Sequence, residues 1–303
     1  MKITQFTKKA LLPFLMVTML HASSDVNSTD QSLRALPSEY NMIVAYYGRP
    51  NVKSLGLLGQ SSLEDVMQQV KAKAKQYEKA LGNGQKVTPG FDLIYELATA
   101  DPGRAGNYVL TLNEKTLLKY ITAAQENGIV VFLDVQLGKK TPAQAVKPLL
   151  KYLKYDNVHI AVDPEFSIDN EKVRPGKVIG EISGSQINAV QDMMSSYLKE
   201  NNITENKILL VHMFTEHMVT DKKSLKYTDR VHIVMHLDGH GSPALKIKTY
   251  NGLYTENRSA KISGGFKVFL KQDNPMMTPK QVLGLEPVGN KRVRDMPKLI
   301  TYQ

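Results

Sequence analysis

The chain lacks several features that would assign it to a common class of protein. None of its 303 residues is a cysteine, so it has no disulfides and no cysteine to carry a lipid anchor. No Gly-x-Gly-x-x-Gly turn follows the first predicted strand and no Gly-x-x-x-x-Gly-Lys-Ser/Thr sequence occurs, which argues against nucleotide binding. No apolar run beyond the N-terminal segment is long enough to cross a bilayer. We therefore predict a protein without a cofactor that is not inserted in a membrane.

The N-terminal segment has the pattern of an export signal. Lys2, Lys8 and Lys9 form a basic start, residues 10–20 form a short apolar core, and cleavage is expected near Ala22. The apolar core is short and contains a proline, which argues against a membrane anchor. The protein is therefore expected to be exported, either to the periplasm or out of the cell. The predicted organisation is a signal peptide over residues 1–22, a polar, flexible leader over 23–38 and one domain over 39–303.

The excess of positive charge does not predict nucleic-acid binding. The whole chain carries +10, and removal of the signal and its three lysines leaves +7. The lysines are scattered through helical patterns, as in residues 71–79 (KAKAKQYEK), without interleaved aromatics. A solvated helix face explains such a pattern, with attraction to anionic cell-surface polymers as the alternative.

Short apolar runs alternate with helical patterns along the rest of the chain. The runs are nearly continuous in Val, Ile, Leu and aromatic residues, as expected for parallel strands that are buried on both faces. The predicted strands are residues 41–48, 90–98, 129–138, 158–166, 207–214, 231–239 and 265–273, with a weaker one at 298–303. The predicted helices are residues 61–84, 113–128, 141–153, 183–202 and 278–285.

Local signals support these helices, and the alternation predicts the fold. Ser62 lies three residues before Asp65, Pro142 suits a first helical turn, and Pro148 predicts a kink or break in its helix. Repeated strand–helix units fit either a doubly wound open sheet or a closed (β/α)8 barrel. Because the nucleotide-binding turn of the open sheet is missing, we predict a single-domain (β/α)8 TIM barrel.

Polar side chains occur at the predicted C-terminal ends of most strands, where barrel enzymes place their active sites. Side chains two residues apart on a strand share a face, so Asp163 and Glu165 are expected to point together into the barrel mouth. A carboxylate at a strand end can also simply cap the next loop. The candidate residues are Tyr46, Tyr47, Glu96, Asp134, Gln136, Asp163, Glu165, His212, Phe214, His236, Asp238 and Asp273.

Clustered carboxyl groups predict acid–base chemistry of the kind that cleaves glycosidic bonds. One carboxyl group stays protonated and another stays ionised when their environments move the pKa values apart. Glu165 is predicted to be the acid, because Phe166 shields it from water and Asp163 repels its negative charge. Asp134 or Asp238 is predicted to be the partner, and the sequence does not rank them. The predicted substrate-binding residues are Tyr46, Tyr47, Glu96, Gln136, His212, Phe214 and Asp273, although aromatic residues at strand ends also occur as plain packing.

Histidines give a competing interpretation. His212, His236 and Asp238 lie at neighbouring strand ends, with His217 and His240 close by in sequence. Histidine and aspartate at a barrel mouth are suitable zinc ligands, but the spacing does not match His-Glu-x-x-His. Ordinary hydrogen-bonded histidines are the simpler interpretation, so no metal is predicted.

Several of these motifs resemble a known family when they are taken together. PGFDLIYELA, VFLDVQLG, AVDPEF, LLVHMF, HLDGHG, GFKVFLKQDNPMMTP and the final TYQ resemble a family of exported bacterial barrel proteins that has no assigned activity. The likeness covers residues 40–303 and implies the barrel fold and export. Asp163-x-Glu165 is also similar to part of the acidic signature of chitinase-like and lysozyme-like barrel hydrolases. The longer Asp-x-x-Asp-x-Asp-x-Glu run is absent, which argues against substrate-assisted cleavage of N-acetyl sugars.

The leading hypothesis is an exported glycoside-hydrolase-like enzyme that acts on a cell-envelope or environmental polysaccharide. A non-catalytic envelope protein that binds glycans is one alternative. A metal-dependent hydrolase that uses His212, His236 and Asp238 is another.

Overall fold

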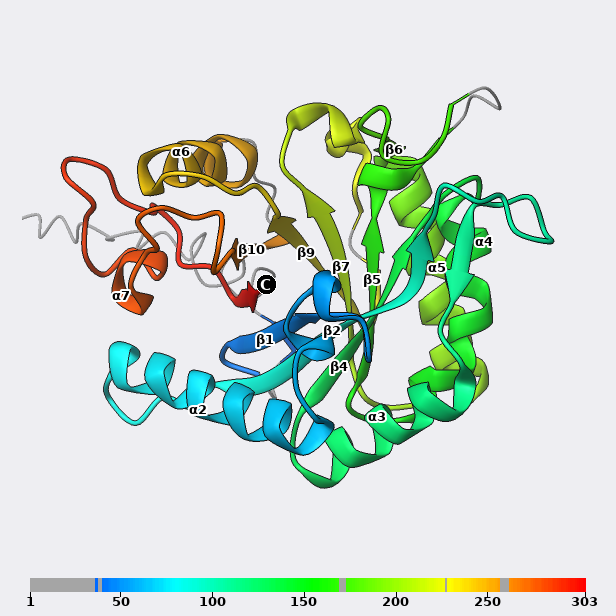
Figure 1. Cartoon of the computed structure of the whole chain (residues 1–303), viewed down its shortest axis with the longest axis horizontal. Coiled ribbons are helices and arrows are strands. Elements are labelled where there is room, and N and C mark those ends of the chain that lie inside the picture. The colour runs from blue at the N-terminus through cyan, green and yellow to red at the C-terminus, as the bar shows by residue number, and fades with distance from the viewer. Residues whose placement is uncertain (1–35, 38–39, 169–172, 227, 257–261) are drawn as a thin grey trace, which may run out of the picture.

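The computed structural model describes residues 36–37, 40–168, 173–226, 228–256 and 262–303. In this part of the chain eight parallel strands close into a barrel, and the helices lie outside the ring of strands (Figure 1). The first strand, β1, pairs with β2 on one side and with β11 on the other, which closes the ring. The predicted single-domain (β/α)8 barrel is confirmed. In order around the ring, the strands are β1 (Ile43–Gly48), β2 (Thr88–Ala98), β4 (Val130–Gln136), β5 (Val158–Asp163), β7 (Lys207–Met213), β9 (Val231–Leu237), β10 (Ile262–Val268) and β11 (Leu299–Tyr302).

Each predicted apolar run overlaps one barrel strand, but the ends differ by up to five residues. The largest effect on the site is at β5, which ends at Asp163 and not at Phe166. Pro164 has no N–H to donate to a sheet, and Pro164–Phe166 form the 3-10 turn η4. A short strand, β3 (Val109–Thr111), adds antiparallel to the end of β2, and β6 (Ile182–Ser183) pairs with β8 (Val219–Thr220).

The helices begin where the sequence provides capping groups. The Ser62 side chain accepts a hydrogen bond from the backbone N–H of Asp65, and Thr141 forms a capping box with Gln144. The predicted break at Pro148 is confirmed, because α4 ends before it and a 3-10 segment follows.

One helix, α6, was not predicted. The α-helices are α2 (Leu63–Leu81), α3 (Glu114–Glu126), α4 (Pro142–Val146), α5 (Gly184–Glu200), α6 (Pro243–Tyr250) and α7 (Pro279–Val282). The shorter helical segments are η1 (Lys53–Leu55), η2 (Leu57–Gly59), η3 (Lys147–Lys154), η5 (Glu216–Met218), η6 (Lys222–Ser224) and the π-helical η7 (Asn251–Glu256).

Two hydrophobic cores stabilise the barrel. The larger one lies between the strands and the surrounding helices. The smaller one fills the lower lumen, by which we mean the barrel interior at the N-terminal ends of the strands. It consists of Ile43, Ala45, Val130, Phe132, Ala161, Ile208, Leu210, Val234 and Leu299, with Leu36 packed against them. Because this end is filled with apolar side chains, a cavity inside the barrel has room only at the C-terminal ends of the strands.

The N-terminal predictions fall mostly outside the described residues. The predicted signal peptide, residues 1–22, lies wholly outside them, and so does most of the predicted leader. Leu36, which belongs to that leader range, is buried in the lower lumen. Among the helices that the structure describes, none combines the length and the apolar character needed to cross a bilayer.

Candidate functional site

A cavity of about 500 Å³ opens at the C-terminal ends of the barrel strands. Polar and charged side chains from six strands or the residues after them reach it, while apolar rings cover parts of the wall. The residues that matter most for its chemistry are Tyr47, Gln136, Asp163, Glu165, Asp238 and Lys267. The position agrees with the general location of active sites in barrels of this type.

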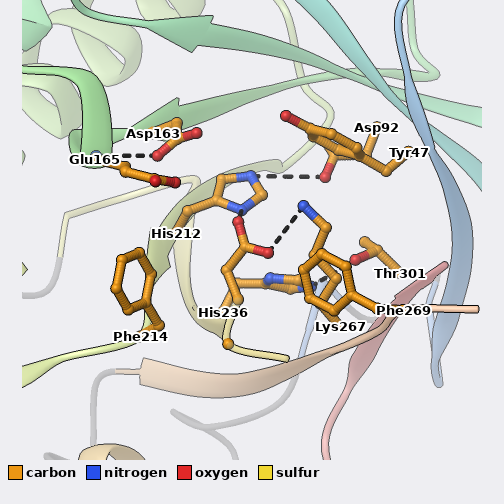
Figure 2. A network of polar contacts seen from close by, with 12 residues as sticks. Tyr47, Asp92, Asp163, Glu165, His212, Phe214, His236, Lys267, Phe269 and Thr301 are labelled. Atoms are coloured by element: carbon orange, nitrogen blue, oxygen red, sulfur yellow. Dashed lines mark hydrogen bonds and ion pairs between the residues drawn. The ribbon is translucent and has the colours of Figure 1, made fainter. Parts of the chain in front are cut away.

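Glu165 lies on the cavity wall in the turn that follows β5. Its backbone N–H donates a hydrogen bond of 3.0 Å to the Asp163 side chain, and this contact fixes the turn (Figure 2). Burial raises the pKa of Glu165 to about 7, with further contributions from the negative charges of Asp163 and Asp238. Phe166 follows directly and lines the same cavity. At neutral pH Glu165 is therefore divided between its protonated and ionised forms.

Asp238, at the end of β9, is held in the opposite state. Its two carboxylate oxygens lie 2.8 Å from Lys267 Nζ and 3.0 Å from His212 Nδ1. Burial alone would raise the pKa of Asp238, but the Lys267 ammonium and the hydrogen bond from His212 hold it below its usual value. One wall of the cavity therefore carries a permanently ionised carboxylate, while Glu165 on another wall keeps a proton up to neutral pH.

Beneath the cavity floor lie Asp92 on β2, Asp134 on β4 and His212 on β7. All three side chains are fully buried. Burial raises the pKa of Asp92 to about 6 and that of Asp134 to about 7. Burial opposes protonation of His212, but its hydrogen bond with Asp238 and the carboxylates of Asp92 and Asp134 raise its pKa to about 10. One donor atom from each of the three residues lies within 4.8 Å of the others, so this group could hold a metal ion.

Tyr47 and Lys267 complete the wall between these groups. Lys267 Nζ lies 3.5 Å from the centre of the Tyr47 ring, which is a cation–π contact. The Tyr47 hydroxyl accepts a hydrogen bond of 3.3 Å from Gln136, whose carbonyl oxygen in turn binds the backbone N–H of Ala98. Gln136 is therefore oriented by the end of the neighbouring strand as well as by Tyr47.

The predicted histidine set is only partly brought together: the His212 and His236 ring centres lie 5.0 Å apart, but His217 and His240 lie elsewhere. His236 is buried and its Nε2 lies 3.1 Å from the Thr301 hydroxyl on β11. A Cβ at Gly265 would lie 2.6 Å from the His236 ring, so the glycine gives this imidazole its room. His217 is exposed in η5, and His240 is an exposed residue at the cavity rim. The structure instead brings His212 together with two aspartates.

Seven of the predicted site residues line the cavity or touch its lining. Glu165, Asp163, Asp238, Tyr47, Gln136 and Phe214 line it directly, and His212 contacts Asp238. Asp134 lies one layer below, fully buried. The prediction that Asp163 and Glu165 share one mouth agrees with this placement, but the reason differs, because the two residues are linked through a turn and not through strand alternation.

Two predicted residues, Tyr46 and Glu96, lie outside the cavity lining. The Tyr46 hydroxyl is directed at the Gln69 carbonyl of α2, in the layer between strands and helices. A bulge between Ile94 and Glu96 shifts the register of β2, and the Glu96 carboxylate forms an ion pair with Lys140.

Asp273 has a structural task beside the cavity. One of its oxygens accepts a hydrogen bond from the backbone N–H of Gly241, and the other lies 2.9 Å from Lys246 Nζ. Lys246, in turn, donates to the carbonyl of Gly239. Asp273 therefore fixes the loop after β9, while Lys246 lines the cavity.

Two central residues, Asp92 and Lys267, were missed. Asp92 lies inside β2, and Lys267 lies one residue before the end of β10, which the predicted strand placed five residues too late; both are buried. The available signal was the charge itself, since a charged residue in a strand that is buried on both faces needs a partner.

Comparison of the chain with protein-family models, with curated proteins and with solved structures found no match. The family likeness of the sequence motifs therefore stays a prediction.

Proposed function

We propose that this barrel is a hydrolase of glycosidic bonds, with Glu165 as the general acid and Asp238 as the partner carboxylate. The observation that carries the proposal is that, among the three carboxyl groups that line one cavity, Glu165 and Asp238 are in opposite states. Glu165 keeps its proton up to neutral pH, and Asp238 is held ionised by its ion pair with Lys267. Glycosidic-bond hydrolysis uses such a pair.

Each group has a defined role in this proposal. Protonated Glu165 gives its proton to the oxygen of the leaving sugar, so the bond breaks without expelling an alkoxide. Ionised Asp238 stabilises the positive charge that develops at the anomeric carbon. Water then adds its hydroxyl group to this carbon and gives its remaining proton to the deprotonated Glu165, which restores the acid. Asp163 positions Glu165 through the turn contact. Asp238 is preferred to Asp134 as the partner, because Asp238 lines the cavity and Asp134 is buried beneath it.

The rest of the cavity fits a carbohydrate in its mixture of surfaces. Phe166, Phe214 and Phe269 offer apolar rings, while Gln136 and Lys246 offer hydrogen-bonding groups. A sugar ring has apolar faces and hydroxyl groups around its edge, so it needs both kinds of contact. The predicted export signal and the positive charge of the chain favour an anionic or neutral polysaccharide outside the cytoplasm as the substrate.

The test is cleavage of polysaccharides by the purified protein. The release of reducing ends is measured over a panel of bacterial envelope and environmental polysaccharides, with the parent protein, Glu165→Gln and Glu114→Gln. The last variant is the matched control, because Glu114 is an exposed residue on α3, away from the cavity. Loss of the general acid is expected to lower kcat by about 10²–10⁴-fold, with no change in the Glu114→Gln protein.

Two outcomes would contradict the proposal. Cleavage at the parent rate by Glu165→Gln would remove Glu165 from its role. If the parent protein binds a glycan saturably but releases no reducing ends, it is a glycan-binding protein and not a hydrolase. The melting temperature of each variant shows whether a lost activity reflects lost folding.

A further inference from the structure

Five polar atoms meet below the cavity floor without a hydrogen-bond partner. They are both carboxylate oxygens of Asp92, both carboxylate oxygens of Asp134, and Nε2 of His212. The three side chains have no exposed surface. A buried polar atom without a partner costs about 1–3 kcal/mol, and more when it is charged. The proposed acid–base reaction uses none of these atoms.

We propose that Asp92, Asp134 and His212 bind one divalent metal ion of the zinc or manganese type. The site lies under the acid–base pair and is joined to it through the contact between His212 and Asp238. Donor atoms of the three residues already lie within 4.8 Å of one another, and His212 Nε2 is 3.6 Å from the Asp92 carboxylate (Figure 2). Metal–ligand bonds of about 2.0–2.2 Å place neighbouring donors roughly 3–3.5 Å apart, so the side chains need to close by about 1 Å around the ion.

The contact on the other side of the imidazole supports this assignment. His212 Nδ1 lies 3.0 Å from the Asp238 carboxylate. A bound ion would replace the proton on Nε2 of the protonated ring, so that Nδ1 keeps its N–H and Nε2 presents its lone pair to the ion. Nε2 is the atom that faces Asp92. A metal-binding histidine usually donates its second ring N–H to a carboxylate in this way, which fixes the ring and makes it a stronger ligand.

The charges of the described residues favour a cation at this point. Lys267 forms its ion pair with Asp238, and Lys246 forms one with Asp273. Among the described residues, no lysine or arginine forms an ion pair with Asp92 or Asp134. Apart from the His212 imidazole, which lies 3.6 Å from Asp92, no basic side chain of the described residues forms an ion pair with these two aspartates, and a divalent ion would balance their charge.

The donor set narrows the choice of ion. One imidazole nitrogen with carboxylate oxygens suits zinc or manganese, whereas soft thiolate sites are excluded in a chain without cysteine. Three protein ligands leave at least one position open. Ile94 and Gln136, each two residues beyond a proposed ligand, line the cavity directly above. A water molecule or another oxygen ligand would complete the coordination.

The test measures metal binding and does not depend on any activity. The full chain, purified without chelator, is analysed for metal content. It is then stripped with chelator and titrated with Zn²⁺, Mn²⁺ and Co²⁺ by calorimetry, with the visible absorption of bound Co²⁺ as a second readout. We expect one ion per chain for the parent protein. Asp134→Asn and Asp92→Asn are each expected to weaken binding at least 100-fold.

Glu165→Gln is the matched control, since it removes a neighbouring carboxylate that is not a proposed ligand, and it should bind as the parent does. Near-UV circular dichroism establishes that each variant is folded. If the parent binds no ion, the inference is wrong. Binding that survives in both asparagine variants would place the ion elsewhere and also contradict it. If both variants fail to fold, the Co²⁺ spectrum of the parent decides, because an ion held by an imidazole and carboxylates absorbs differently from the hydrated ion.

Discussion

The lower and upper halves of the barrel interior differ sharply, although the same strands build both. On β4, Phe132 belongs to the lower lumen and Asp134, two residues further on, lies below the cavity. On β7 the same step leads from Leu210 to His212. The lower half is filled mainly with apolar side chains, with the buried His159 packed against Phe132 among them. The upper half gathers charged groups, several of which have no hydrogen-bond partner.

This difference separates the residues that stabilise the barrel from those that serve its chemistry. Apolar burial in the lower half contributes directly to the free energy of unfolding. The buried carboxylates of the upper half lower the free energy of unfolding, unless they are protonated, paired with a basic group or bound to an ion. The barrel stays folded despite this loss in free energy of unfolding because its hydrophobic cores are large. Buried charged groups of this kind are common in active sites.

The largest effect on stability is expected from the lower half. Ile43→Ala removes a fully buried side chain of the lower lumen and should reduce the free energy of unfolding by about 2–5 kcal/mol. Urea denaturation at pH 7 measures this loss. The pH dependence of any cleavage activity should not change, because Ile43 does not line the cavity. A shift in the pH dependence of cleavage by Ile43→Ala would contradict the proposal that the two halves act separately.

The pH dependence of activity probes the upper half. Burial and the charges of Asp163 and Asp238 raise the pKa of Glu165 to about 7, although Lys267 and His212 oppose the shift. A general acid works in its protonated form, so kcat/KM should fall as the pH rises through 7. Above that point the fall is about tenfold per pH unit, or about 1.4 kcal/mol. Rates between pH 5 and 9 measure it, with the melting temperature recorded over the same range. If kcat/KM instead rises as the pH passes through 7, Glu165 acts as a base and not as an acid.

Most of the fold could be predicted because its signals are local. Continuous apolar runs identified all eight barrel strands, and capping residues such as Ser62 and Thr141 mark real helix starts. Helix α6 follows directly on the loop after β9 and was missed. Its eight residues, PALKIKTY, are too short to show a clear helical period.

The site was predicted less completely, for a reason that lies in the geometry of β2. Its strand-end carboxylate, Glu96, was chosen, but the bulge before it takes this residue out of the set that lines the cavity. The residue that β2 contributes to the site is Asp92, further down the same strand. A bulge depends on contacts with neighbouring strands, so the sequence of one strand does not reveal it. Asp163 and Glu165 were found because the Asp-Pro-Glu turn is a local feature.

The central claim is that the upper half holds carboxylates that do not stabilise the fold, and Asp134→Asn tests it most directly. In the presence of chelator at pH 8, this change replaces an unpaired buried carboxylate with a neutral side chain of nearly the same shape. The free energy of unfolding, measured by urea denaturation beside the parent protein, should rise by about 1 kcal/mol. A clear loss of stability under the same conditions would mean that the Asp134 carboxylate holds the barrel together, and the division between the two halves would be wrong.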